Sequence, residues 1–346
     1  MEKSNILITG GAGFVGSNLG YYILNNYNIN KLYIVDNLLS SDTSNIPNNE
    51  KVEFIYGSIA EDRVLQKIKD EFDYIFHLSC YHGNQSSILN PLLDHENNTL
   101  TSLKLFDCIK DFNNLKKVVY SAAGCAVAEK TNDEPLATLE DAPISLFHDS
   151  PYSISKIIGE MYGNYYFSRN KLPFVKARFQ NVYGPREILG AGSWRGTVHT
   201  VWRNVIPAFI WKSLNHEALP LDNGGLGSRD FIFVDDIVRG LLACALKGKP
   251  GESYNLASGV DTTILELANL INFNTNSKTP HSIKPPREWD NSGRRYGSVL
   301  KSKKELGFET QVHIEDGISK TVEWTQNNKK LIETNIEKHK FFIKKS

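Results

Sequence analysis

The 346-residue chain is predicted to form an α/β fold, a doubly wound parallel sheet with a smaller mixed α/β lobe. Two observations predict it. Short apolar runs rich in β-branched residues alternate with amphipathic segments of helical period, and closely spaced glycines follow the first run. The alternation ends near residue 185, beyond which Gly, Trp and Arg become frequent. We therefore expect one domain over residues 1–185, a lobe over 186–330 that exchanges a strand and a helix with it, and a basic tail over 331–346.

The first strand is expected at Asn5–Thr9, an apolar run too short for a helix. Phe14, Val15, Leu19 and Ile23 then repeat at helical spacing. Further strands are expected at 31–36, 51–56, 73–78, 115–122 and 173–179, and helices at 61–72, 97–111, from 152 onward, and at 205–214, 235–246, 264–271 and 315–346.

The glycine-rich turn after the first strand is typical of dinucleotide binding. Gly10 lets the chain leave the strand, Gly13 lets a pyrophosphate approach the backbone, and Gly16 lets the helix lie close to the sheet. The second strand ends in Asp36, 20 residues after Gly16, where a ribose 2′-hydroxyl needs an acceptor. A carboxylate there would repel a 2′-phosphate, and neither Asn37 nor the next residue is an arginine. The predicted cofactor of this Rossmann domain is therefore NAD.

Composition excludes several other classes of protein. Lysine plus arginine equals aspartate plus glutamate, 39 each, so the net charge favours neither nucleic acid nor membrane as a partner. The four cysteines, Cys80, Cys108, Cys125 and Cys244, show neither metal-ligand spacing nor a disulfide pattern. No signal-peptide region or membrane-length apolar run is present. We expect a cytoplasmic protein without a bound metal.

Tyr152 and Lys156 lie one helical turn apart on one face of the expected helix. A phenol with a pKa of about 10 is a poor base, but a neighbouring ammonium stabilises its phenolate. Such a tyrosine takes the proton of a sugar hydroxyl while the carbon gives hydride to nicotinamide. By itself the spacing also fits two surface neighbours; downstream of a dinucleotide motif it favours catalysis.

The chain resembles the extended short-chain dehydrogenase/reductases that act on nucleotide sugars, the NAD-dependent epimerases and dehydratases. The resemblance runs from about Asn5 to Trp324. It is carried by Thr9–Gly16, Val35–Asn37, His77–Ser79, Tyr152 with Lys156, Asn181–Pro185 and Arg229–Asp236.

This resemblance implies roles for individual residues. The cofactor would contact Gly10, Gly13, Phe14, Val15, Gly16, Asp36, Asn37, Ser58, Ile59, Leu78, Ser79, Asn97, Tyr152 and Lys156. The substrate would contact Ala123, Gly124, Asn181, Arg195, Asn204, Arg229 and Arg287, and the two arginines Arg229 and Arg287 would neutralise its diphosphate. Tyr152, Lys156, Ser121 and Cys125 are the catalytic candidates.

Some positions depart from the family pattern. The family has Ser or Thr where this chain has Ala123, so either Ser121 supplies the hydroxyl or Tyr152 acts without one. Dehydratases have Asp-Glu where this chain has Gly124 and Cys125, which disfavours dehydration. Ser58 replaces the usual aspartate beside the adenine.

Cys125 and the segment 192–196 resemble the 3,5-epimerases of GDP-sugars, in which a lysine partners the cysteine. This chain has Arg195 there, and arginine exchanges protons poorly.

Three hypotheses follow. The first is oxidation at C4 of a nucleotide-diphosphate sugar, with GDP-sugars favoured, giving a 4-keto sugar or the 4-epimer for surface-carbohydrate biosynthesis. The second is a 3,5-epimerase that uses Cys125. The third is an NAD-binding sensor without turnover. The apolar faces of the helices at 97–111 and from 152 suggest a homo-oligomer, a dimer or tetramer.

Overall fold

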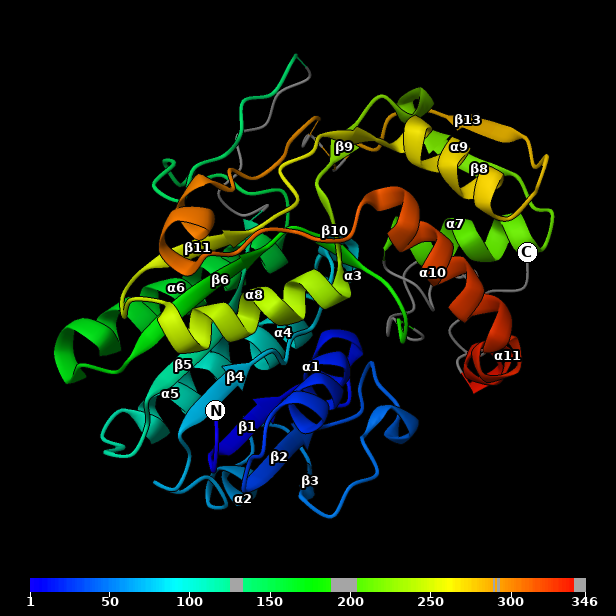
Figure 1. Cartoon of the computed structure of the whole chain (residues 1–346). Coiled ribbons are helices and arrows are strands. Elements are labelled where there is room, and N and C mark those ends of the chain that lie inside the picture. Colours follow the sequence, from blue (N-terminus) through cyan, green and yellow to red (C-terminus); the bar gives the residue numbers. More distant parts are fainter. Residues whose placement is uncertain (125–132, 188–203, 289, 291–292, 339–346) are drawn as a thin grey trace.

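The computed structural model describes residues 1–124, 133–187, 204–288, 290 and 293–338. At its centre is a seven-stranded sheet in the order β11-β6-β5-β4-β1-β2-β3, in which every neighbouring pair is parallel (Figure 1). Its strands are β1 (Asn5–Thr9), β2 (Lys31–Asp36), β3 (Val52–Tyr56), β4 (Tyr74–His77), β5 (Lys117–Ala123), β6 (Phe174–Phe179) and β11 (Ser253–Leu256). The predicted doubly wound parallel sheet is confirmed. Strand order reverses between β1 and β4, the point at which such sheets bind ligands.

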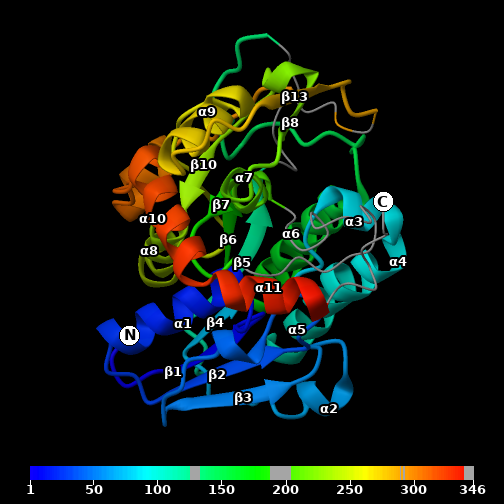
Figure 2. The same ribbon diagram turned by 90° about the vertical axis from the view of Figure 1, so that its right-hand side faces the viewer.

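Helices cover both faces of the sheet. Successive side chains of a strand point to opposite faces, so each strand contributes to two cores. Ile6 and Ile8 of β1 belong to the core shared with α1 and α8, whereas Leu7 belongs to the core shared with α5 and α6. Figure 2 shows the first pair of helices on one side of the sheet and the second pair on the other. The helices packed around the sheet are α1 (Phe14–Asn26), α2 (Asp62–Leu65), α3 (Asn84–Leu89), α4 (Pro91–Asp94), α5 (Thr101–Ile109), α6 (Pro151–Asn170) and α8 (Val234–Lys247).

The remaining elements form a second lobe beyond the carboxyl ends of the strands (Figure 1). Three two-stranded pairs belong to it: β7 (Asn181–Tyr183) with β10 (Phe231–Phe233), β9 (Ser228–Arg229) with β12 (Thr262–Thr263), and β8 (Leu219–Asp222) with β13 (His281–Lys284). Its helices are α7 (Val205–Leu214), α9 (Ile264–Asn274), α10 (Ile314–Asn327) and α11 (Lys329–Lys338). Ile332 of α11 is buried against Ala208 and Trp211 of α7, so part of the segment 331–346 is a packed helix. Its last residues, 339–346, lie outside the described ones.

Several elements differ from those expected. The helix expected at 61–72 spans only Asp62–Leu65, because Phe72 turns in to pack edge-on against Tyr33 and the Asp70 carboxylate accepts from the N–H groups of Asn113 and Asn114. The helix expected at 97–111 is confirmed as α5 over Thr101–Ile109, but it begins as a wider π-helical turn, His95–Leu100, which joins α4 to α5. Helix α3 was not predicted.

Strand β11 pairs with β6 as the seventh strand of the sheet and was not predicted either. Its polar Asn255 is buried and donates to the carbonyls of Thr138 and Ser298, so no apolar run marks the strand in the sequence. The expected boundaries at 185 and 330 stay predictions. Among the helices that the structure describes, none has both the length and the apolar character needed to cross a membrane.

Candidate active site

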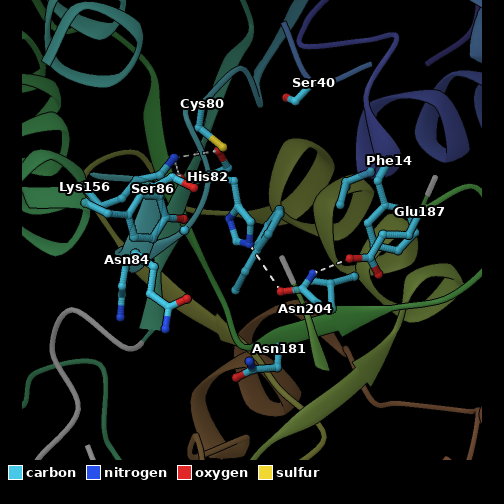
Figure 3. A pocket seen from close by; sticks show the side chains of 18 of the residues that line it. Phe14, Ser40, Cys80, His82, Asn84, Ser86, Lys156, Asn181, Glu187 and Asn204 are labelled. Carbon is cyan, nitrogen blue, oxygen red and sulfur yellow. Dashed lines mark hydrogen bonds between the residues drawn. The ribbon is translucent and has the colours of Figure 1, made fainter. Parts of the chain in front are cut away.

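A cavity of about 830 Å³ opens where the carboxyl ends of the central strands meet the second lobe. It is lined by residues at or just after the ends of β1 to β6, and by second-lobe residues from Asn181 to Arg295 (Figure 3). Apart from Gly124 and two residues outside the described part, every residue that the sequence placed at the site lines this cavity: Gly10, Gly13, Phe14, Val15, Gly16, Asp36, Asn37, Ser58, Ile59, Leu78, Ser79, Asn97, Ser121, Ala123, Tyr152, Lys156, Asn181, Asn204, Arg229 and Arg287.

The turn between β1 and α1 leaves no room for side chains. Gly10 has a φ of +71°, and a Cβ there would lie 2.7 Å from the backbone of Ser79. A Cβ on Gly16 would lie 2.2 Å from the carbonyl oxygen of Gly10 and 2.7 Å from the Cα of Gly11. The first turn of α1, with its unpaired N–H groups, can therefore lie at the cavity wall, where a phosphate would be bound.

Asp36 lies at the end of β2 and faces the same turn. Its carboxylate accepts hydrogen bonds from the N–H of Ala12 (3.0 Å), the N–H of Leu38 (2.8 Å) and the hydroxyl of Ser41 (2.8 Å). Burial raises the pKa of this carboxyl, while these hydrogen bonds act in the opposite direction. A glycine cradle with a carboxylate fixed beside it fits the pyrophosphate and ribose of NAD.

Tyr152 lies at the start of α6, which is positioned by one local and one long-range hydrogen bond. The Ser150 hydroxyl accepts from the N–H of Ser153, and the Ser87 hydroxyl accepts from the N–H of Tyr152 (3.0 Å). The Lys156 ammonium is buried and lies 5.9 Å from the centre of the Tyr152 ring. It donates to the carbonyl of Ser121 at 2.9 Å. The structure thus brings the phenol and the ammonium together at the cavity.

Ser121, the candidate to supply the missing hydroxyl, and Ala123, which stands where the family has Ser or Thr, lie two residues apart at the end of β5. The hydroxyl of Ser121 donates to the carbonyl of His77 in β4 (3.1 Å). Ala123 packs in an apolar cluster with Tyr152 and Ile157. A hydrogen bond into the sheet thus already holds the Ser121 hydroxyl, and the side chain at 123 offers only a methyl group.

His77 of β4, whose carbonyl accepts from Ser121, is buried in the sheet. Its ring nitrogens lie 2.7 Å from the hydroxyl of Thr9 and 3.1 Å from that of Ser102. Burial, together with the charge of Lys156, lowers the pKa of His77 to about 3. The imidazole is therefore neutral, and it places no second positive charge beside the ammonium.

Sequence reasoning missed His82 and Glu187, which form a hydrogen-bonded chain with Asn204 (Figure 3). The Asn204 amide donates to Glu187 (2.6 Å), so its oxygen faces Nε2 of His82 (3.3 Å). An amide oxygen can only accept, so Nε2 carries the proton, and Nδ1 is an acceptor when the imidazole is neutral. The His82 ring also lies edge-on to Tyr152, with 5.5 Å between ring centres.

Burial raises the pKa of Glu187 to about 8, and the hydrogen bond from Asn204 partly offsets this rise. Each of these residues follows a motif that the sequence analysis used. His82 comes five residues after His77, and Glu187 two residues after Pro185. Their proximity to these motifs was the signal in the sequence by which both residues could have been found.

Arginines from the second lobe complete the cavity. Arg229 forms an ion pair with Asp290 (3.2 Å) and donates to the carbonyl of Gly293 (2.8 Å). Arg287 forms an ion pair with Asp222. Arg294 and Arg295 also line the cavity and were not among the expected residues.

Three expected site residues do not line the described cavity. Gly124 is buried beside it, where a Cβ would lie 2.2 Å from the amide nitrogen of Gln180. Cys125 and Arg195 lie outside the described residues.

Comparison with known proteins agrees with this geometry. Residues 6–257 match the model of the "NAD dependent epimerase/dehydratase family". The chain belongs to this family. It is thus an enzyme of the NAD-dependent nucleotide-sugar epimerase/dehydratase class, a group of extended short-chain dehydrogenase/reductases, and its cofactor is NAD.

Relatives span almost the whole chain. WbmF of Bordetella bronchiseptica, solved with NAD+ and UDP, is 53% identical with a TM-score of 0.86, over 98% of this chain and 97% of that one. A putative UDP-glucose 4-epimerase of Methanocaldococcus jannaschii is 30% identical over 93% of this chain and 99% of its own length. A UDP-glucose 4-epimerase of Thermotoga maritima, solved with UDP-glucose, is 30% identical with a TM-score of 0.83, over 94% of this chain and 99% of that one.

Proposed function

We propose that this member of the epimerase/dehydratase family oxidises C4 of a UDP-sugar, giving a 4-keto sugar or, after hydride return to the other face, the 4-epimer. The observation that carries the proposal is the buried Lys156 ammonium, 5.9 Å from the Tyr152 ring, in the cavity that also holds the glycine turn. Surface-carbohydrate biosynthesis stays a prediction.

The roles of the chain's own residues follow from their positions. Bound NAD supplies the acceptor for the hydride from C4. Tyr152, as phenolate, takes the proton of the C4 hydroxyl, and the Lys156 ammonium stabilises the phenolate charge. Because Ser121 is already hydrogen bonded to His77, we propose that Tyr152 takes the proton without a serine hydroxyl.

The nucleotide is proposed as UDP rather than the GDP favoured from the sequence. The structure of WbmF, 53% identical, holds UDP, and the Thermotoga structure holds UDP-glucose. Arg229 and Arg287 would bind the diphosphate, since guanidinium groups pair well with phosphate oxygens.

The test is incubation of the purified protein with UDP-, GDP-, CDP- and dTDP-sugars, followed by NMR of the products. We expect change at C4 of a UDP-sugar, and Tyr152→Phe should lower kcat at least about 100-fold. Tyr165→Phe is the matched control, because Tyr165 is on the same helix with a largely exposed side chain. Loss of water from the sugar, or full activity of Tyr152→Phe, would refute the proposal. No change in any of the sugars would also refute it and would favour the sensor hypothesis.

A second candidate, 3,5-epimerisation, is favoured by His82. Arg195 is a poor proton donor or acceptor, but His82 places an imidazole beside Tyr152 that can exchange a proton with a carbon next to a 4-ketone. Deuterium from solvent should then enter C3 or C5, and His82→Gln or Cys125→Ala should abolish that exchange. Unchanged exchange in both variants would dismiss this candidate.

We also infer that the chain forms a dimer through α5 and α6. Met161 and Tyr165 of α6 are each more than half exposed, and with Leu103 of α5 they line a shallow apolar hollow. Light scattering should give twice the chain mass, and Met161→Glu should reduce it to that of a monomer.

A further inference from the structure

The arginines that line the cavity fall into two groups. Arg229, Arg287 and Arg294 each form an ion pair, with Asp290, Asp222 and Asp261 respectively. Arg295 is 9% exposed and lines the same cavity, yet within the described part of the chain no acidic side chain or other acceptor pairs with it. A guanidinium has five donors and stays charged at physiological pH, so a buried one favours an anion.

The backbone around Arg295 places it between the proposed diphosphate residues and the reacting end of the cavity. Two residues before it, the carbonyl of Gly293 accepts from Arg229. Two residues after it, a Cβ on Gly297 would lie 2.8 Å from the Gln180 amide nitrogen, and the same nitrogen lies 2.2 Å from a Cβ built on Gly124.

Gly124 directly follows Ala123, which packs with Tyr152. The segment 293–297 therefore runs from Arg229 toward Tyr152, and Arg295 is midway along it. In the proposed function the sugar ring occupies that interval, between its diphosphate and the phenol.

We propose that Arg295 binds a carboxylate carried by the sugar, so that the substrate class is a nucleotide-linked sugar acid. This inference rests on the proposed function and specifies its sugar. A planar carboxylate can accept two parallel hydrogen bonds from a guanidinium, and it neutralises the buried charge. A neutral sugar would leave the charge of Arg295 uncompensated beside the ring. The diphosphate is the other anion of such a substrate, and the experiment separates the two.

The experiment is calorimetric titration of the full-length, NAD-loaded protein with UDP, UDP-glucose and UDP-glucuronate. The two sugars differ only at C6, as an alcohol or a carboxylate. We expect UDP-glucuronate to bind at least about tenfold more tightly than UDP-glucose. Arg295→Gln should bring the two within about threefold of each other and leave UDP within about threefold of its wild-type affinity.

Two variants accompany it. Arg294→Gln, the matched control, removes the adjacent arginine that is paired with Asp261, and it should retain the preference for the acid. Arg295→Lys keeps the charge without the planar fork and should retain part of the preference, which separates recognition from a folding defect. Melting temperature and NAD content are measured for each.

The inference is overturned if the wild-type protein binds both sugars alike. It is also overturned if Arg295→Gln weakens UDP, UDP-glucose and UDP-glucuronate by one common factor, because Arg295 would then bind the diphosphate. A protein that prefers the acid but oxidises no sugar at C4 would contradict the proposed function and leave this inference standing.

Discussion

The two halves of the cavity are built in different ways. The half proposed to hold the cofactor includes the turn after β1 and the end of β2, where the N–H of Ala12 donates to the Asp36 carboxylate 24 residues later. The half proposed to bind the substrate is lined by charged and polar side chains from distant segments. His82 and Asn204, which hydrogen bond to one another, are separated by 122 residues.

We expect the two halves to tolerate substitutions differently. Backbone N–H groups and the absence of a Cβ define the cofactor half, so most changes there also disturb the packing of α1 on the sheet. Side chains define the substrate half, and one of them can change while the fold stays intact. Substitutions in the first half should therefore reduce both NAD binding and stability, whereas substitutions in the second half should reduce substrate binding alone.

The largest effect is expected at Gly16. Gly16→Ala places a Cβ 2.2 Å from a backbone oxygen, so α1 must shift. We expect NAD affinity to fall about 100-fold, equivalent to about 3 kcal/mol, together with a lower melting temperature. Gly20→Ala is the control in the same helix. Its Cβ would have ordinary contacts at 3.5 Å and 3.6 Å, and alanine favours a helix by about 1 kcal/mol. Similar NAD affinities for the two variants, by titration, would remove the distinction between the halves.

A smaller effect is expected at the arginines of the substrate half. Arg229→Gln should weaken UDP binding about tenfold, because its side chain is only 15% exposed. Arg287→Gln should cost about threefold or less, because that side chain is 39% exposed and water screens its charge. NAD affinity should be unchanged in both. A parallel loss of NAD binding would mean that the two halves are not independent.

The smallest effect is expected at Glu187, through stability rather than binding. Its folded pKa, raised by burial to about 8, exceeds that of an ordinary carboxyl, so the unfolded chain releases the proton first as pH rises. The carboxyl thus destabilises the fold progressively between about pH 4.5 and pH 8, with no further loss above that range.

We expect the melting temperature of the wild-type protein, relative to that of Glu187→Gln, to fall by about 2 to 4 °C from pH 5.5 to pH 8. Glu288→Gln, at an exposed carboxyl of the second lobe, is the control. A difference that stays constant with pH would show that Glu187 is ionised throughout.

The success of the sequence analysis followed the same division. Apolar runs and glycine spacing predicted six of the seven sheet strands and the NAD cradle, because these depend on neighbours in the chain. Strand β11 was missed because its buried Asn255 makes its hydrogen bonds to residues 138 and 298, which no local pattern reveals. His82 and Glu187 were missed for a similar reason, since the residue to which both hydrogen bond, Asn204, lies 122 and 17 residues away from them in the sequence.

By itself the sequence determined the parallel sheet, the choice of NAD and the pairing of Tyr152 with Lys156, all of which depend on spacing within one turn or one strand-turn-helix unit. Only the tertiary structure shows which charged side chains of the cavity are paired with one another. Arg229 and Arg294 have carboxylate partners, which is why the sugar carboxylate is proposed to bind Arg295, and pairing is a property of side chains that the fold brings together from separate segments. Local interactions determine the elements of a fold, whereas the electrostatics of a cavity depend on its whole lining.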